Sequence, residues 1–310
     1  MAKRGNGEGS IFYSEKLNRW VGQFTAGRKA DGKLNRKSVY GKTRKEVKEK
    51  ITKALADLQN NTFIEKNDIT VYELAKEIID DKKDSNSISE NTYKRATYTL
   101  KYIKNGSISD IPIQRIKAQD IKDYLKTVTI YANSTIEKIY QLLGQVFRRA
   151  IERDYIIKNP MLFEEVKRPV SDKQDKDVIP LSIEEEKKLI DVVSRENKAY
   201  KNIILLMLFS GMRIGEVLAL KITDFDNNFI SISSTITRDE NDKSILGKKV
   251  KTINSKRTII INSTIREILN DSMKNSTANE NNLLFCDTHS KGIIKPYEVN
   301  SYLKRINKKY

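Results

Sequence analysis

The sequence predicts a multidomain α+β protein: a small three-stranded sheet with a helix, an all-α domain of four helices, and an incomplete mixed α/β domain. Three observations predict it. The chain has 310 residues, of which 38% are apolar, enough to bury more than one core. Polar stretches at 59–69 and 167–180 interrupt the pattern and resemble linkers. The residues between these breaks have helical spacing. We therefore expect domains at 1–62, 68–168 and 178–310.

The first block begins as a hairpin. β-forming residues flank a polar turn at 16–18, and a third strand, KLNRKSVYG, follows a turn at 30–32. Thr43 then opens a helix, because Glu46 stands three residues later as in a capping box. Apolar residues keep helical spacing behind it: Val47, Ile51, Leu55 and Leu58.

Small basic sheets of this type can lay strands in the major groove of DNA. In this block we expect Arg28, Lys29, Arg36 and Lys37 to contact phosphates or bases. Its aromatic residues are expected in the core rather than stacked on bases: Trp20, Phe24 and Tyr40.

The second block reads as helix throughout. Thr70 and Glu73 form another capping box, Ser89 begins a helix that runs to Lys104, and a shorter helix spans 117–127. A fourth begins at Asn133 or Ser134 and is expected to end near Pro160. The candidate phosphate contacts here are Lys94, Arg95, Arg148 and Arg149, although a solvated helix face explains each of them equally well.

The third block mixes helices and strands. Ser182 and Glu185 cap a helix through Val193, and a buried helix follows at 199–209. Beyond the segment SGMRIGEVLAL, a turn and a short helix, the expected order is three strands, a helix, a short strand and a last helix from Pro296. The ranges are 229–237, 247–253 and 257–261 for the strands, 263–274 for the helix, and 283–286 for the strand LLFC.

The charge of the chain favours a polyanionic partner. The formal net charge is +17, and residues 1–70 hold 16 Lys and Arg against 8 Asp and Glu. Each phosphate that Lys or Arg neutralises releases condensed counterions, so nucleic acid ranks ahead of a solvated basic surface or ribosome association. One cysteine, Cys286, excludes an internal disulfide. The first ten residues lack the apolar stretch of a signal peptide, and the longest apolar run, 203–209, is too short to cross a bilayer. We therefore expect a cytoplasmic, nucleoid-associated bacterial protein with no membrane contact.

Two segments carry a family pattern. FSGMRIGEVLALKITDFD (209–226) contains Gly-x-Arg-x-Gly-Glu followed by Leu and an Ile-x-Asp element, and VKTINSKRTIIIN (250–262) contains Lys-Thr-x-x-Ser-x-Arg-x-Ile. Together they resemble the first conserved box and the β-hairpin of the tyrosine recombinases, the integrases of phages and mobile elements. The first block is similar to their arm-type DNA-binding domain, and the second to their four-helix core-binding domain.

The resemblance implies a mechanism. Phosphodiester cleavage places extra charge on non-bridging oxygens, which a planar guanidinium meets at two points. By resemblance Arg213 takes that role, and Lys251 protonates the leaving 5′-oxygen. Glu216 is expected to orient Arg213 or to cap its helix. Without the pattern, Arg213 reads as an ordinary ion-paired arginine, and Lys251 has the neighbours Lys248, Lys249 and Lys256.

The family's later elements, a His-x-x-Arg box, a further His or Trp, and a nucleophilic Tyr, are not found in the 310 residues. The lone histidine, His289, reads as a loop residue, and with Cys286 it gives too few ligands for zinc. Tyr297, Tyr302 and Tyr310 precede the position of the missing box and are rejected as nucleophiles. The chain thus reads as C-terminally truncated and inactive alone.

The leading hypothesis is site-specific DNA integration through a 3′-phosphotyrosine, with no metal and no cofactor. The full protein would act as a homotetramer on double-stranded attachment sites, with an excisionase or a host DNA-bending protein as possible partners. The alternative is a non-catalytic DNA-binding remnant or regulator. A metal nuclease ranks third, because the acidic residues form no metal motif and no phosphate-binding Gly loop is present.

Overall fold

The computed structural model describes residues 9–28, 31–60, 62–174, 177–196, 198–239, 241–247 and 256–309. The chain divides into two compact units, the first made of residues 1–87 and 93–175 and the second of 88–92 and 176–310. Each of the three blocks expected from the sequence holds a hydrophobic core of its own. Residues 88–92 group with the second unit, whereas the sequence places them in the helical block.

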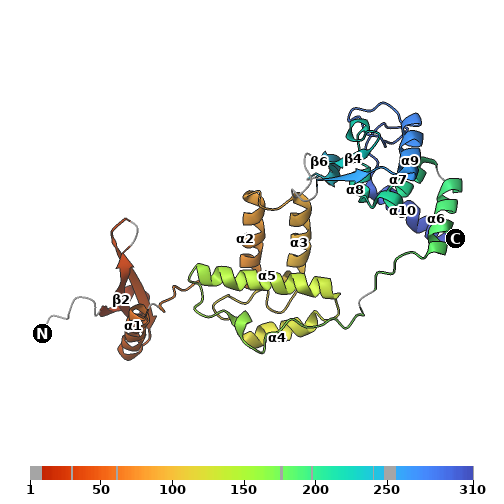
Figure 1. The fold of residues 1–310 in the computed structure, drawn as a ribbon. Coiled ribbons are helices and arrows are strands. Elements are labelled where there is room, and N and C mark those ends of the chain that lie inside the picture. The colour runs from red at the N-terminus through yellow and green to blue at the C-terminus, as the bar shows by residue number, and fades with distance from the viewer. Residues whose placement is uncertain are drawn as a thin grey trace. The chain divides into compact units, whose positions relative to one another are not determined.

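The first unit begins with an antiparallel sheet in the order β1-β2-β3 (Figure 1). Its strands are β1 (Ser10–Ser14), β2 (Arg19–Arg28) and β3 (Leu34–Gly41), and helix α1 (Arg44–Gln59) packs on one face. Asn18 adopts a left-handed conformation at the expected first turn, after the short 3-10 helix η1 (Glu15–Leu17). Thr43 accepts the backbone N–H of Glu46, which confirms the predicted start of α1.

Cross-strand register decides which residues of this sheet face α1. Gly22 lies against Val47 and Ile51 of the helix, so residues of the opposite parity face away from it. Val21 pairs with Tyr40, which therefore lies on the uncovered face and is 45% exposed. The expectation that Tyr40 belongs to the core is wrong for this reason, whereas Phe24 is buried as predicted.

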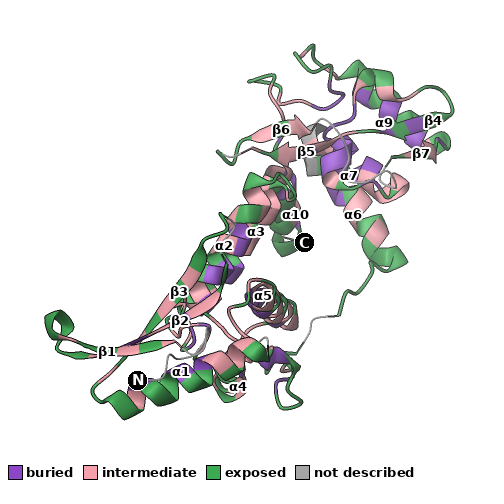
Figure 2. Ribbon diagram, turned by 90° about the vertical axis from the view of Figure 1, so that its left-hand side faces the viewer, coloured by how far each residue is buried: buried purple, intermediate pink, exposed green. Residues whose placement is uncertain are grey.

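The helical part of the first unit contains α2 (Val71–Asp84), α3 (Glu90–Lys104) from residue 93 onward, α4 (Ala118–Thr127) and α5 (Asn133–Glu152). A 3-10 helix, η2 (Pro160–Leu162), follows. The capping box of Thr70 and Glu73 is present in full. Buried residues recur at helical spacing in α2, α4 and α5, and Figure 2 colours buried residues purple.

Helix α5 ends seven residues earlier than the expected end near Asn159. Asp154 adopts a φ of 55°, and the N–H of Tyr155 donates to the carbonyl of Ala150 at 2.8 Å. This six-residue closure satisfies the last carbonyls of a helix and usually has glycine at the left-handed position. An aspartate there gave no stop signal in the sequence.

The second unit surrounds a core formed chiefly by α7 (Lys198–Ser210), α9 (Ser263–Lys274) and α10 (Pro296–Lys309), with α6 (Ile183–Glu196) packed against α7. Two antiparallel strand pairs accompany them. Strand β4 (Phe229–Ile232) pairs with β7 (Arg257–Ile260), and β5 (Thr235–Arg238) pairs with β6 (Ser244–Gly247). The short helices α8 (Ile214–Val217) and η3 (Ile222–Asp224) lie between α7 and β4 in the chain.

Three predicted strands of this unit differ from the structure. The single strand expected at 229–237 is two strands, β4 and β5, which belong to separate antiparallel pairs. LLFC contributes buried side chains and a single bridge, from Leu283 to Lys221, rather than a strand. The strand expected at 247–253 falls mainly outside the described residues, and β6 lies earlier, at 244–247. Helices α9 and α10 lie where the sequence predicts them. Within the described ranges, no helix combines the length and apolar composition that a bilayer crossing requires.

Candidate active site and nucleic-acid interface

Two glycines shape the segment that carries Arg213. Gly211 has a φ of 66°, so the chain reverses after α7 and begins α8 three residues later. A Cβ on Gly215 would lie 2.6 Å from Thr235 Oγ1, so only glycine lets α8 pack this closely on β5. The pattern Gly-x-Arg-x-Gly-Glu thus places Arg213 at the N-cap of a short helix, with Glu216 one turn further on.

Glu216 is a buried carboxylate that accepts hydrogen bonds from two arginines. Its side chain is 4% exposed. The backbone N–H of Arg213 donates to Oε2 and its Nη1 to Oε1, both at 2.9 Å. Arg257, the first residue of β7, donates from Nη1 to Oε1 at 3.0 Å and from Nη2 to Oε2 at 2.8 Å. Both contacts expected of Glu216, with the guanidinium of Arg213 and with the start of its helix, are present.

The carboxyl of Glu216 is held in its ionised form. Burial alone raises its pKa. The hydrogen bonds from Arg257 and Arg213 outweigh that effect and lower the pKa from an ordinary 4.5 to about 2. The pKa of Arg257 is raised in turn, chiefly by its hydrogen bonds to Glu216. At neutral pH the group therefore consists of two cations and one anion, with a net charge of one positive unit.

The two arginines differ in what they leave exposed. The side chain of Arg213 is 75% exposed and that of Arg257 is 32% exposed. Arg257 uses both terminal nitrogens on Glu216, whereas Arg213 uses only Nη1. Arg213 therefore keeps donors that can meet an anion. Sequence reasoning matched Arg257 to the hairpin pattern but did not identify it as the partner of Glu216.

The other predicted site residues are placed as follows. Lys251 lies outside the described residues, as do Lys248, Lys249 and Tyr310. His289 is an exposed loop residue, as predicted, and its N–H donates to Asp287 Oδ1 at 3.1 Å. Tyr302 is 5% exposed, within the core of the second unit, and Tyr297 lies at the start of α10. Among the described residues, no cluster of His, Cys, Asp and Glu could hold a metal ion.

The N-terminal sheet separates the predicted contacts of β3. Arg36 is exposed on the face that α1 leaves open, whereas Lys37 points to the opposite face and pairs with Glu65 at 2.6 Å. Arg28 ends β2 and donates to the carbonyl of Gly32 at 2.9 Å. Lys29 lies outside the described residues. The open face also presents Phe12, which is 43% exposed and, like Tyr40, pairs with Val21.

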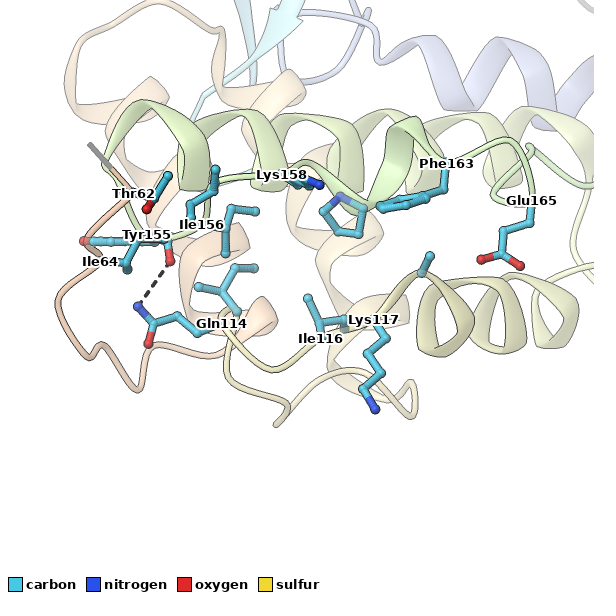
Figure 3. Close-up of a pocket in the computed structure, with 14 residues that line it drawn as sticks. Thr62, Ile64, Gln114, Ile116, Lys117, Tyr155, Ile156, Lys158, Phe163 and Glu165 are labelled. Carbon is cyan, nitrogen blue, oxygen red and sulfur yellow. Dashed lines mark hydrogen bonds between the residues drawn. The ribbon is translucent and has the colours of Figure 1, made fainter. Parts of the chain in front are cut away.

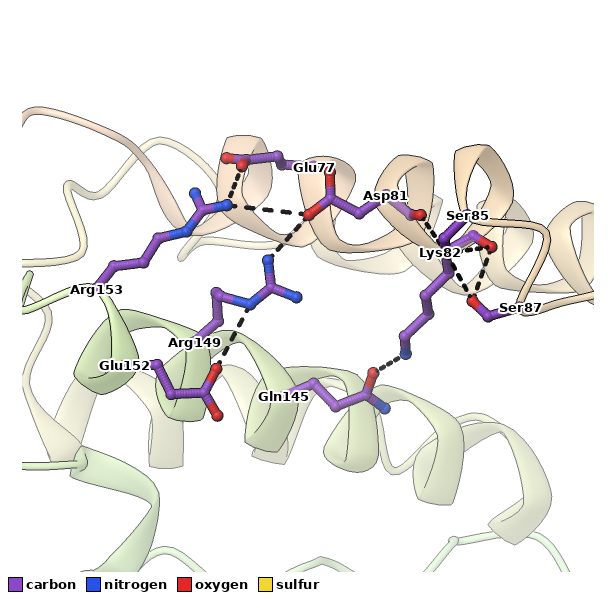
Figure 4. Close-up of polar contacts among 9 residues, drawn as sticks. All are labelled: Glu77, Asp81, Lys82, Ser85, Ser87, Gln145, Arg149, Glu152 and Arg153. Carbon is purple, nitrogen blue, oxygen red and sulfur yellow. Dashed lines mark hydrogen bonds and ion pairs between the residues drawn. The ribbon is translucent and has the colours of Figure 1, made fainter.

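In the helical part, Arg95 and Arg148 are exposed and Lys94 is half-buried. Arg149 has a different environment (Figure 4). It pairs with Asp81 of α2 at 2.9 Å and with Glu152 at 3.6 Å, and is only 29% exposed. Arg153 pairs with Glu77 at 2.5 Å beside it. Arg149 therefore belongs to an ion-pair network between α2 and α5, whereas its neighbour Arg148 is exposed.

A hollow of about 820 Å³ beside α4 and η2 is lined mainly by apolar side chains, including Ile64, Ile116 and Phe163 (Figure 3). Lys117 extends away from it. No cluster of acids, bases or nucleophiles among its lining residues would support a reaction. The hydrogen-bonded group of Arg213, Glu216 and Arg257 lies in the second unit, away from this hollow.

Known proteins match the chain in both units. The model of the phage integrase family matches residues 181–310, and that of the phage integrase central domain matches 71–162. The chain belongs to the phage integrase family of tyrosine recombinases. The first match contains Arg213, Glu216 and Arg257, and the second contains the four helices α2 to α5.

Curated relatives include other integrases and recombinases. A tyrosine recombinase XerC-like protein of Caldanaerobacter subterraneus subsp. tengcongensis is 29% identical over 206 residues, covering 65% of this chain and 52% of that protein. The ICEBs1 integrase of Bacillus subtilis is 30% identical over 176 residues, covering 54% of this chain and 46% of that protein. The chain thus spans about half the length of these relatives.

Solved structures show the same fold. The Tn1549 transposon integrase in complex with a circular intermediate DNA has a TM-score of 0.67 at 20% identity, and the match covers 78% of this chain and 80% of that chain. A lambda integrase tetramer bound to a Holliday junction has a TM-score of 0.56 at 15% identity, over 99% of this chain and 82% of that one. The predicted three-part architecture, with a mixed α/β domain of this family, is confirmed.

The pKa of Glu216 predicts a pH-dependent stability. Since its pKa of about 2 in the folded chain lies below the ordinary 4.5, the carboxylate stabilises the fold above pH 4.5, and this contribution is lost as pH falls to about 2. The shift corresponds to roughly 3 kcal/mol. We expect the unfolding free energy of Glu216→Gln to lie below that of the wild type at pH 7, by an amount that shrinks toward pH 2.

Urea unfolding followed by circular dichroism between pH 7 and pH 2.5 measures this difference. Glu267→Gln removes an exposed carboxylate of α9 and serves as the control, expected to change stability at pH 7 by less than about 0.5 kcal/mol. A Glu216→Gln deficit that stays constant from pH 7 to pH 2.5 would contradict the ion-pair account.

Proposed function

We propose that this chain is the DNA-binding and phosphate-activating portion of a site-specific tyrosine recombinase, which breaks and rejoins DNA through a 3′-phosphotyrosine. One observation carries the proposal: an arginine that is 75% exposed is anchored on a carboxylate that is 4% exposed. A guanidinium held in this way presents fixed donors to a phosphate before the reaction begins. Preorganised donors of this kind, aimed at developing charge, are typically worth about 3 kcal/mol each.

In this proposal Arg213 contacts the non-bridging oxygens of the scissile phosphate, and Glu216 orients it. By family resemblance Lys251 is the general acid that protonates the leaving 5′-oxygen. No tyrosine of the 310 residues is assigned as the nucleophile, because none follows a His-x-x-Arg sequence and Tyr302 is buried. We therefore propose that residues 1–310 bind and orient DNA without forming the covalent intermediate.

The proposed DNA contacts lie in both parts of the first unit. The open face of the N-terminal sheet carries Arg36 with exposed aromatic residues, and Arg28 stands at the end of β2. In the helical part Arg95 and Arg148 are exposed, with Lys94 beside them; Lys29 joins this set from the sequence. Positive side chains of this kind bind phosphates without reading sequence, so they hold the duplex while the second unit meets the scissile bond.

The partners follow from the same proposal. The substrate is double-stranded DNA of an attachment site inside a bacterial cell, with no metal and no cofactor. The lambda integrase structure is a tetramer on a Holliday junction, which supports a homotetramer for the complete recombinase. An excisionase or a host DNA-bending protein would bias the direction of the reaction.

We predict a steep salt dependence of DNA binding that the exposed arginines carry. A preferred duplex is first selected from a random pool with the chain itself. Each phosphate contact contributes roughly 0.9 to the slope of log K against log salt. The triple variant Arg36→Gln, Arg95→Gln, Arg148→Gln is expected to lower that slope by about 2 to 3. Fluorescence anisotropy between 50 and 300 mM salt measures it.

The control for this experiment is Arg195→Gln. Arg195 is 76% exposed on α6 and pairs with Asp191 at 2.7 Å, and it belongs to none of the proposed contacts. It should leave the slope unchanged. An unchanged slope in the triple variant would remove these arginines from the interface.

The same duplex tests the proposal that none of the tyrosines in residues 1–310 forms the covalent intermediate. A nicked suicide version traps a phosphotyrosine, because the short fragment diffuses away and cannot rejoin. We expect residues 1–310 to bind this duplex and to give no covalent band on a denaturing gel. A covalent band that disappears on substitution of one tyrosine would contradict the proposal and would identify the nucleophile.

A further inference from the structure

We propose that Arg257 is a positioning residue of the recombinase site: through the carboxylate of Glu216 it fixes the guanidinium of Arg213 against the scissile phosphate. This inference rests on the proposed function. Arg257 itself touches no substrate in this proposal, since both of its terminal nitrogens are bound to Glu216.

Arg257 fixes the geometry of the Glu216 carboxylate. Arg257 donates one hydrogen bond to each oxygen of Glu216, at 3.0 and 2.8 Å. Such a two-point contact fixes the plane of the carboxylate as well as its position, which a single contact does not. Arg213 adds one side-chain bond, to Oε1. The orientation of the shared carboxylate is therefore set mainly by Arg257 and the backbone N–H of Arg213, and the side chain of Arg213 follows it.

Arg257 belongs to a part of the chain that is distant from Glu216 in the sequence. It lies 41 residues beyond Glu216 and begins β7, where it pairs with Ile232 of β4. Two backbone elements distant in the sequence thus hold the ends of this contact, α8 and the β4–β7 pair. Arg257 also stands six residues after Lys251 in the same pattern. The ion pair of Arg257 and Glu216 therefore connects the two segments that carry the family pattern, 209–226 and 250–262.

Arg257 also contributes to the net charge of the site. Arg213, Glu216 and Arg257 together carry one positive unit, and removing Arg257 leaves none. A buried carboxylate with a single partner would also draw Arg213 inward as its remaining counter-charge, away from a phosphate. Arg257→Gln removes both the charge and the fork, whereas Arg257→Lys keeps the charge and loses the fork. The two variants therefore separate the effect of the positive charge of Arg257 from its effect on the orientation of the Glu216 carboxylate.

The experiment measures the contact of Arg213 with one phosphate. In the selected duplex each phosphate is replaced in turn by a neutral methylphosphonate, and the position is found where the wild type loses affinity and Arg213→Ala does not. A charge-assisted hydrogen bond corresponds to a loss of roughly tenfold or more. We expect Arg257→Gln to lose most of this sensitivity, and the double variant with Arg213→Ala to lose no more than either alone. Arg257→Lys is expected to lie between Arg257→Gln and the wild type.

Arg266→Gln is the matched control. Arg266 is an exposed arginine of α9 that donates to the carbonyl of Asn227 at 2.8 Å, so the variant removes one positive charge from the same unit. It should keep full sensitivity to the methylphosphonate. Thermal melting checks that each variant is folded. If Arg257→Gln does not fold, the sensitivity of Arg257→Lys to the methylphosphonate tests the positioning role instead.

The outcomes separate the two claims. Wild-type sensitivity in a folded Arg257→Gln protein, or in Arg257→Lys if the first variant does not fold, would overturn the positioning role and leave the proposed function standing. A duplex in which no methylphosphonate distinguishes the wild type from Arg213→Ala would instead overturn the proposed function, and this inference with it.

Discussion

The buried carboxylate of Glu216 is the contact on which the site depends. A carboxylate that is 4% exposed is tolerated only when it is paired and hydrogen-bonded, and here it accepts four hydrogen bonds from Arg213 and Arg257. Those bonds lower its pKa to about 2, so the charge persists at any physiological pH. Glu216 thereby holds two arginine side chains in place. Arg257 uses both terminal nitrogens on the carboxylate, whereas Arg213 uses only Nη1 and keeps donors for an anion.

Arginine has two different roles in this chain, and exposure distinguishes them. Arg149 and Arg153 join α2 to α5 through Asp81 and Glu77 and are 29% and 31% exposed. Their charges are neutralised within the fold. Arg213 is 75% exposed although it is also paired. A net charge of +17 indicates only that a polyanionic partner is favoured. Which arginine side chains can contact that polyanion depends on the ion pairs that each of them makes within the fold.

Much of the fold could be predicted from the sequence because its helix starts are marked locally. The caps at Thr43, Thr70 and Ser182 all form as the residue spacing predicts. The end of α5 was missed because Asp154 takes the left-handed position that glycine usually marks. Tyr40 was misplaced because the face of a residue in a sheet depends on cross-strand register, which the composition of a single strand does not fix.

The candidate site was predictable only in part. The spacing of Arg213 and Glu216, three residues apart at a helix start, gives their contact directly. The contact of Glu216 with Arg257 depends on how β7 pairs with β4, a long-range arrangement that no local pattern encodes. The family motif placed Arg257 in the hairpin segment, yet its contact with Glu216 required the folded chain.

The most direct measurement of this account is a crystal structure of the chain bound to its selected duplex. We expect the guanidinium of Arg213 to lie within hydrogen-bonding distance of a backbone phosphate, with Glu216 still bridging it to Arg257. A complex in which Arg213 turns into the protein, or in which Glu216 has released both arginines while the duplex lies elsewhere, would contradict it.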